Sequence, residues 1–256
     1  MTDGVSLNNL NVVYSDKRVL QELTANLGAS RLTALIGPNG SGKSTLLRAM
    51  AGLIPYEGSL TLGDREIRRW TRRELGRKVG FLPQNGSVTF PFVACDLIDL
   101  GRLPRRRAFQ IRTGRDDGAT VRAARAVGVE PLLFRSMKEL SGGESQRVMI
   151  AMLLNQDPDL FLLDEPTSSL DPGQAVAVLS LFRRLTQRGK TVVVAAHDIN
   201  GVLTWADSVM ALKKGRLLFH GAPADLTGAN LEGIYDTPFT AYRSEKGETL
   251  WHASSP

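Results

Sequence analysis

The stretch Gly37-Pro38-Asn39-Gly40-Ser41-Gly42-Lys43-Ser44-Thr45 decides how the rest of the chain is interpreted. It fits the pattern G-x-x-x-x-G-K-[ST], in which glycines allow consecutive backbone N–H groups to turn toward phosphate oxygens. An apolar run, residues 31–37, leads into it, and a segment with helical spacing, residues 43–52, follows it. This strand–loop–helix context is the one that the motif requires, and it predicts a nucleotide phosphate site at a helix N-terminus.

Two side chains of this loop and two carboxylates elsewhere have predicted roles. Lys43 should reach the β- and γ-phosphates, and the Ser44 hydroxyl should bind Mg²⁺. Such a site also needs a carboxylate at the end of a neighbouring strand, and the apolar run of residues 159–166 contains Asp164 and Glu165 at its end. We predict that Asp164 holds Mg²⁺ through water and that Glu165 orients and polarises the attacking water.

Three further candidates lie at the ends of other predicted strands. His197 closes a β-branched run and could hydrogen-bond the γ-phosphate, and its place beside the predicted catalytic strand favours this role over a structural one. Gln84 ends a short apolar run, and its amide oxygen could meet Mg²⁺ or the attacking water. Tyr14 ends the first strand and could stack on adenine, although ordinary packing is the simpler interpretation of that residue alone.

Strand-like and helix-like segments alternate in the last third of the chain and around the glycine loop. Because the strands have the continuous apolar character of buried ones, the alternation predicts an α/β fold with a parallel sheet. The N-terminal segments alternate as antiparallel strands do, which predicts an added β layer, whereas residues 86–158 read as a helical insert. The predicted strands are residues 5–14, 18–27, 31–37, 59–62, 78–84, 159–166, 190–198 and 208–221; residues 173–189 are a predicted helix, and the C-terminal end, from residue 248, is expected to be frayed.

The composition excludes several classes of protein. The chain has 256 residues, of which 42% are hydrophobic, and this is enough for a sizeable core. Its apolar runs are far shorter than the ~18–20 residues of a membrane-spanning helix, and its N-terminus does not resemble a signal peptide. The lone Cys95 excludes an internal disulfide and a cysteine metal cluster, and we expect it to be a small core residue.

The charge is unevenly distributed. The formal net charge is +6, and arginines are concentrated in residues 102–115 and 65–78. Such patches can bind nucleic acid, acidic lipid headgroups or nucleotide phosphates. A solvated surface is the simpler interpretation for most of these arginines.

A second glycine loop, Glu139-Leu140-Ser141-Gly142-Gly143-Glu144, completes an ordered set of motifs. The set runs from the first loop through Gln84, this second loop, the Asp164–Glu165 pair and Asp171 to His197, and in that order it resembles the nucleotide-binding subunit of ATP-binding cassette (ABC) transporters. The resemblance covers the chain from Tyr14 to about Gly221. It implies a P-loop NTPase core of the RecA-like kind, with the antiparallel β layer and a helical subdomain added. Residues 1–85 and 159–256 would form the two parts of the core, and residues 86–158 the helical subdomain.

The resemblance also explains why one chain has two phosphate loops. In this family two subunits pack head to tail, and each LSGGQ-type loop caps the ATP that the partner's P-loop holds. It implies that Ser141, Gly142 and Gly143 contact the partner's γ-phosphate and that Asp171 links the two sites across the interface. The expected cofactors are ATP and Mg²⁺. Glu144 stands where the most familiar spelling of the motif has Gln, and because a carboxylate would repel phosphate we expect it to point aside.

A finer resemblance concerns the cargo. Leu100-Gly101-Arg102-Leu103-Pro104 is similar to the "GRxP" stretch of ATPases for iron–siderophore, haem and vitamin B12 (cobalamin) uptake. This implies an import motor on the cytoplasmic face of the inner membrane, attached peripherally to a multispan permease that works with a substrate-binding protein. The surface that follows Gln84 would receive a short helix of the permease.

Two other functions are weighed against the import motor. A soluble ABC-type ATPase that acts on nucleic acid or ribosomes is the main alternative, but such proteins typically have two cassettes or a coiled-coil insert, so we expect no nucleic acid partner. An inactive binding module would not need Lys43, Asp164, Glu165 and His197 together.

Overall fold

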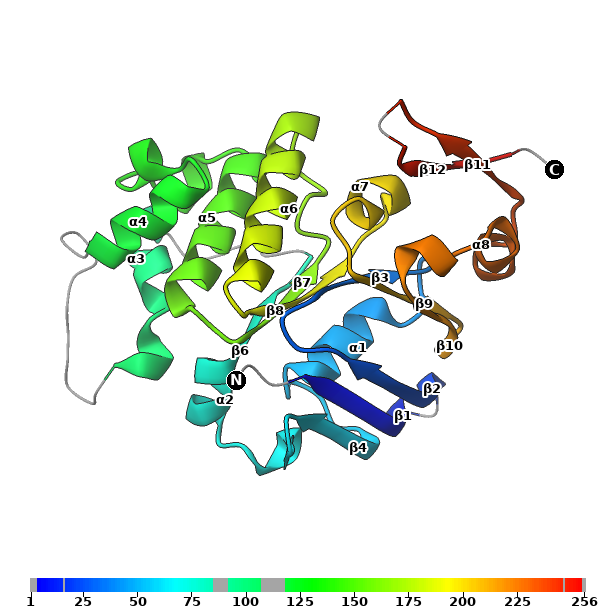
Figure 1. Ribbon diagram of the computed structural model, residues 1–256. Helices are drawn as coiled ribbons and strands as arrows, with labels where there is room; N and C mark the ends of the chain where they lie inside the picture. Colours follow the sequence, from blue (N-terminus) through cyan, green and yellow to red (C-terminus); the bar gives the residue numbers. More distant parts are fainter. Residues whose placement is uncertain (1–3, 16, 85–91, 107–117, 246, 255–256) are drawn as a thin grey trace.

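A six-stranded sheet with the strand order β10-β9-β3-β8-β7-β6 forms the centre of the molecule (Figure 1). The computed structural model describes residues 4–15, 17–84, 92–106, 118–245 and 247–254. The strands β3, β6, β7, β8 and β9 are parallel, and β10 is antiparallel to β9, so the predicted parallel α/β sheet is confirmed. The bounds are β3 (Leu32–Ile36), β6 (Val79–Leu82), β7 (Leu160–Asp164), β8 (Thr191–Ala195), β9 (Ser208–Lys213) and β10 (Arg216–Gly221). Every residue of β3, β7 and β8 is buried, because the sheet is covered on both faces.

A second, four-stranded sheet covers one face of the first, with one helix between them (Figure 1). It has the order β2-β1-β4-β5 and is antiparallel, which confirms the added β layer. Its strands are β1 (Val5–Tyr14), β2 (Lys17–Leu27), β4 (Glu57–Leu62) and β5 (Arg65–Glu66). The intervening helix, α1 (Lys43–Met50), buries Leu46 and Leu47 in the core that both sheets share.

Helices cover the other face of the central sheet. In one contact of this kind, Phe161 of β7 meets Phe182 of α6 edge to face, with ring centroids 5.8 Å apart. These helices are α3 (Ala94–Leu100), α4 (Gly118–Ala126), α5 (Gly142–Gln156), α6 (Pro172–Gln187), α7 (Ile199–Leu203) and α8 (Gly228–Tyr235). A further helix, α2 (Arg72–Lys78), buries Leu75 in the core on the side of the antiparallel sheet. Short 3-10 turns are η1 (Ile67–Arg69), η2 (Leu103–Arg105), η4 (Glu130–Leu132), η5 (Met137–Glu139) and η6 (Pro223–Asp225).

The helical insert is represented by α3, α4 and α5, which follow β6 and precede β7 along the chain. These three helices pack on one another. Cys95 lies in the core of this group, 1% exposed, as expected. The domain boundaries remain a prediction, and the one at residue 86 lies outside the described residues. So do residues 85–91, the first part of the surface after Gln84. No helix among the described residues combines the length and the apolar character that crossing a bilayer requires.

Two expectations about the C-terminal third are wrong. Residues 208–221 are two strands, because Lys214 and Gly215 have φ angles of 49° and 78° and turn the chain back as a hairpin. The C-terminal end is not frayed at residues 249–253. There, β12 (Thr249–Ala253) pairs with β11 (Phe239–Arg243), and it is anchored through two hydrogen bonds between Trp251 and Asn200.

Candidate functional site

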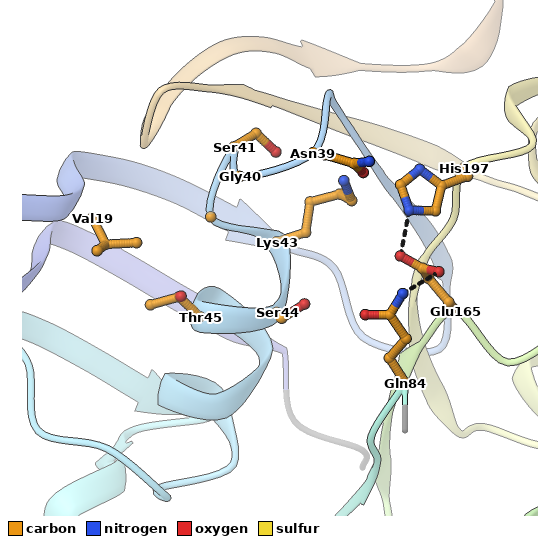
Figure 2. A pocket seen from close by; sticks show the side chains of 11 residues that line it. Val19, Asn39, Gly40, Ser41, Lys43, Ser44, Thr45, Gln84, Glu165 and His197 are labelled. Carbon is orange, nitrogen blue, oxygen red and sulfur yellow. Dashed lines mark hydrogen bonds and ion pairs between the residues drawn. The ribbon is translucent and has the colours of Figure 1, made fainter. Parts of the chain in front are cut away.

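A cleft of about 420 Å³ opens between the start of α1 and the carboxyl ends of the central strands (Figure 2). Residues 39–45 form one side of it, and Val19, Gln84, Glu165 and His197 complete the lining. The helix α1 begins at Lys43, and its N-cap residue, Gly42, has no side chain to cap it. The first N–H groups of a helix have no partner within the helix, so an uncapped end beside the cleft is suited to bind an anion.

Glycine is required at two positions of the loop. Gly37 has a φ of 145°, and a Cβ atom there would lie 2.1 Å from the carbonyl oxygen of Leu212. Gly42 has a φ of 105°, and a Cβ atom there would lie 2.6 Å from Leu20 Cδ2. Strands β2 and β9 thus press on the loop from outside, and only glycine lets it curve around phosphate groups.

Lys43 is a buried cation at the floor of the cleft. Its side chain points along the loop toward Asn39, His197 and Glu165 (Figure 2). Its Nζ atom donates hydrogen bonds to Gly37 O (2.7 Å) and Pro38 O (3.2 Å). Burial lowers the pKa of Lys43, while the carboxylates of Glu165 and Asp164 oppose this shift. A buried ammonium held only by carbonyl oxygens can gain strong charge-assisted bonds from a phosphate.

Glu165 is held from both sides by the other two polar residues of the cleft. Gln84 Nε2 donates to Glu165 Oε2 (2.6 Å), and His197 Nε2 lies 2.5 Å from Glu165 Oε1 (Figure 2). Glu165 is buried, with 8% of the residue exposed. Strands β6 and β8 end two residues before Gln84 and His197, so these two residues do not end strands, as the sequence had indicated, but start the loops beyond them.

The backbone of Glu165 is in the left-handed region, with a φ of 52°. For a residue with a β-carbon this conformation costs about 1–3 kcal/mol, and it persists only where the surroundings enforce it. Here the Glu165 N–H donates to Ala195 O (2.9 Å), and its carbonyl oxygen accepts from the Ser168 hydroxyl (3.1 Å). Strain of this kind is typical of functional sites, because it places one side chain where regular strand geometry would not.

Asp164 has the properties expected of a magnesium ligand. Both carboxylate oxygens are buried and make no hydrogen bond of normal geometry among the described residues. Burial raises the pKa of Asp164, and the nearby Ser44 hydroxyl opposes this shift. An orphaned carboxylate beside a hydroxyl, at the edge of a phosphate cleft, fits the oxygen ligands that Mg²⁺ takes in such sites.

The second glycine loop lies outside this cleft. Ser141 caps α5, accepting from Glu144 N (3.3 Å), and Glu144 Oε2 accepts from Ser141 N (2.8 Å), so the two form a capping box. The carboxylate of Glu144 is thereby engaged with the helix end, and the hydrogen bonds from Ser141 lower its pKa. Gly143 packs against the backbone of Ser169, where a Cβ atom would lie 2.9 Å from Ser169 O.

Asp171 and Tyr14 are not part of the cleft lining either. Asp171 caps α6, because its Oδ1 atom accepts from Gln174 N (2.8 Å). Tyr14 is 42% exposed at the end of β1, and its role toward adenine remains a prediction. Val19 lines the cleft instead, and an apolar residue in a strand gave no signal in the sequence.

The fold and the cleft together define the class of protein: a P-loop NTPase with an ATP-hydrolase type of site. The sequence profile described as "ABC transporter" matches residues 20–168. The chain therefore belongs to the ABC transporter family, and it is an ATP-binding ATPase coupled to transport.

Several relatives have similar sequences. The chain is 35% identical to the ferric enterobactin transport ATP-binding protein FepC of Escherichia coli over 92% of this chain and 89% of that protein. It is 40% identical to the hemin import ATP-binding protein HmuV of Nocardia farcinica over 87% of this chain and 77% of that one. The manganese transport ATP-binding protein MntB of Listeria monocytogenes is 34% identical, with coverages of 85% and 89%.

Among solved structures, a metal-chelate type ABC transporter in an inward-facing conformation is similar, with a TM-score of 0.84 and 28% identity. That match covers 100% of this chain and 98% of the other chain.

Proposed function

We propose that the chain is the motor subunit of an importer, and that ATP-driven closure of two subunits drives uptake of a metal chelate through a membrane permease. Iron–siderophore complexes, haem and cobalamin are the proposed cargo class. The relatives named for ferric enterobactin and hemin support the first two. The name of the manganese transport relative also indicates a metal cargo, but it does not mention a chelate. The observation that carries the proposal is the pairing of Glu165 with both Gln84 and His197 beside Lys43.

Each residue has a step in the proposed reaction. Lys43 and the N-terminus of α1 bind the phosphates, and Glu165 accepts the proton of the water that attacks the γ-phosphate. Both oxygens of Glu165 are engaged here, so nucleotide binding must release one of them from Gln84 or His197. When bound, Mg²⁺ neutralises charge on the transferred phosphoryl group, and Ser44 and Asp164 are the residues that would hold it.

The position of the second glycine loop supports a site shared between two copies of the chain. Ser141 is exposed at the start of α5, and neither it nor Gly142 and Gly143 line the cleft of their own chain. A second copy placed head to tail would bring this helix end onto the γ-phosphate of the first, with Asp171 at the interface.

Ser141→Arg tests the shared site. We expect ATP binding by the single chain to be unchanged, whereas nucleotide-dependent dimerisation and hydrolysis are lost, because the long cation blocks the approach of the partner's cleft. Asn26→Arg is the matched control, because it adds the same side chain at an exposed position of β2. Light scattering measures the dimer and phosphate release measures turnover. Normal hydrolysis by Ser141→Arg would contradict the shared site.

The membrane partner is tested directly with tagged Glu165→Gln chains, which should hold nucleotide longest. We expect a multispan permease to be captured from detergent-solubilised membranes in ATP and Mg²⁺ and to be identified by mass spectrometry, and the chain to be peripheral on the cytoplasmic face. Lys43→Ala without added nucleotide is the control for capture that does not depend on nucleotide, because this variant should bind ATP about 10- to 100-fold more weakly. Ribosomal proteins in place of a permease would contradict the import motor.

The alternative, a nucleic acid-directed ATPase, finds little support in the arginines that suggested it. Arg65 lies over the Trp70 ring at 4.3 Å, and Arg68 lies over the Tyr56 ring at 4.6 Å. Arg77 Nε donates to Pro104 O (2.7 Å). These guanidinium groups are therefore engaged in contacts within the protein itself. Arg107, Arg112 and Arg115, half of the arginines in residues 102–115, lie outside the described residues.

A further inference from the structure

The C-terminal segment from α8 to β12 contacts the ATP site at two separate points. It lies beyond residues 20–168, which the family profile matches. Figure 1 shows α8 next to β9 and β10, and the β11–β12 hairpin on the same side as α7. The first contact reaches the loop that binds phosphate, and the second reaches the helix that follows His197.

The first contact is a hydrogen bond from Gly37 N to the Tyr235 hydroxyl (3.0 Å). The carbonyl oxygen of the same glycine accepts from Lys43 Nζ (2.7 Å). Gly37 is thus held by the C-terminal helix on one side and by the phosphate-binding lysine on the other. Burial raises the pKa of Tyr235 to about 12, so the hydroxyl remains neutral at physiological pH and the contact does not titrate.

Tyr235 is itself fixed by neighbouring residues. Lys213 at the end of β9 donates to Gly233 O (2.7 Å) and lies 2.6 Å from Asp236 Oδ1, and these contacts fasten the end of α8 to the central sheet. The Tyr235 ring packs on Phe239 with centroids 5.6 Å apart. A side chain that is constrained in this way can transmit a fixed position to Gly37.

The second contact is a pair of hydrogen bonds between Asn200 and Trp251. Asn200 Nδ2 donates to Trp251 O (2.9 Å), and Asn200 Oδ1 accepts from Trp251 N (2.8 Å), so the amide side chain pairs with β12 as another strand would. Asn200 belongs to α7, which Asp198 caps by accepting from Gly201 N (3.0 Å). The chain is therefore bound to the C-terminal hairpin at Asn200, three residues after His197.

We infer that residues 228–253 are a brace for the ATP site, with Tyr235 and Asn200 as positioning residues. Tyr235 holds the phosphate loop in the conformation that binds ATP. Without this contact, the Gly37 peptide would have to become ordered when ATP binds, and this ordering would reduce the binding free energy. Asn200 holds α7 so that His197 meets Glu165 at the geometry that hydrolysis needs. The inference rests on the proposed ATPase function and adds residues outside its motifs.

Tyr235→Phe removes one oxygen atom and leaves the ring. We expect the Kd and the KM for Mg–ATP to rise about 3- to 10-fold, the effect of one buried hydrogen bond, with kcat changed less than about twofold. Tyr242→Phe is the matched control, because Tyr242 is 57% exposed on β11. Nucleotide titration of the full chain and steady-state phosphate release give the three constants.

Asn200→Ala should have the opposite signature: kcat falls about 3- to 10-fold and KM stays unchanged, because His197 acts after ATP is bound. Asn200→Asp keeps the acceptor for Trp251 N and loses the donor, so its kcat should lie between those of Asn200→Ala and the wild type. Because a lower active fraction also lowers the apparent kcat at unchanged KM, kcat is calculated per chain that binds nucleotide. A purely structural role would lower the melting temperature and the number of binding chains and would leave this kcat unchanged.

The outcomes distinguish the brace from the function on which it rests. A wild-type chain that neither binds nor hydrolyses Mg–ATP would overturn both. A wild-type chain that is active, with Tyr235→Phe indistinguishable from Tyr242→Phe in Kd and KM, would overturn the brace alone. So would an Asn200→Ala chain with wild-type kcat. The two separated effects, on KM and on kcat, are the result that supports it.

Discussion

Glu165→Gln should bind ATP as tightly as the wild type and hydrolyse it about 10²- to 10⁴-fold more slowly, the usual contribution of general base catalysis. The change keeps the shape of the side chain and removes only its capacity to accept a proton. The amide oxygen can still accept from Gln84 Nε2, and the amide NH2 group can donate to His197 Nε2 when that nitrogen carries no proton, so the side chain should remain in place. ATP that is bound but not hydrolysed should also leave the dimer closed, which gives a second signal.

Glu57→Gln, on the exposed end of β4, is the matched control and should behave as the wild type. Equilibrium nucleotide titration, single-turnover phosphate release and light scattering separate binding, chemistry and dimerisation. A Glu165→Gln chain that turns over normally would contradict its role as base and shift attention to His197.

Lys43→Ala should weaken ATP binding about 10- to 100-fold, because it removes a buried charge-assisted hydrogen bond worth about 1.5–3 kcal/mol. Hydrolysis should be lost with it, since the same ammonium stabilises the transferred phosphoryl group. Lys43 is only 6% exposed, so truncation also removes the contacts of its aliphatic stem.

Lys43→Met separates these two effects, because it keeps the stem and removes the charge. It should bind ATP as poorly as Lys43→Ala and melt closer to the wild type. Lys138→Ala, at an exposed position, controls for loss of a surface cation. Unchanged affinity in Lys43→Met would contradict the assignment of the loop as the phosphate site.

Most of the fold could be predicted because its signals are local. Buried parallel strands such as β7 and β8 are continuous apolar runs, and the glycine loop between a strand and a helix has few other uses. The β9–β10 hairpin was missed because its turn is Lys214–Gly215. Lys214 adopts a positive φ there, which is uncommon for lysine and could not be expected from its residue type. The hairpin at the C-terminus was missed because β11 and β12 are mostly exposed, and polar strands carry little periodic signal.

The polar residues that meet in the cleft could be predicted, but the contacts that connect them could not. Strand ends in a parallel sheet meet at one edge, so Gln84, Glu165 and His197 could be grouped from sequence alone. The left-handed backbone at Glu165 and the hydrogen bond from Gly37 to Tyr235 could not, because each depends on tertiary contacts between segments far apart in the chain. Tyr235 is 198 residues from Gly37, and nothing in the surrounding sequence marks it.

The placement of Ser141 outside the cleft of its own chain affects how the ATPase rate depends on concentration and whether a defective allele is dominant. If each active site needs two chains, the rate of the isolated subunit should rise with the square of its concentration at high dilution and become proportional to concentration once pairing is saturated. An excess of inactive chains should then lower the ATPase rate of active ones, since most active chains would be paired with an inactive copy. A defective allele of such a subunit would be dominant over the intact one in the same cell.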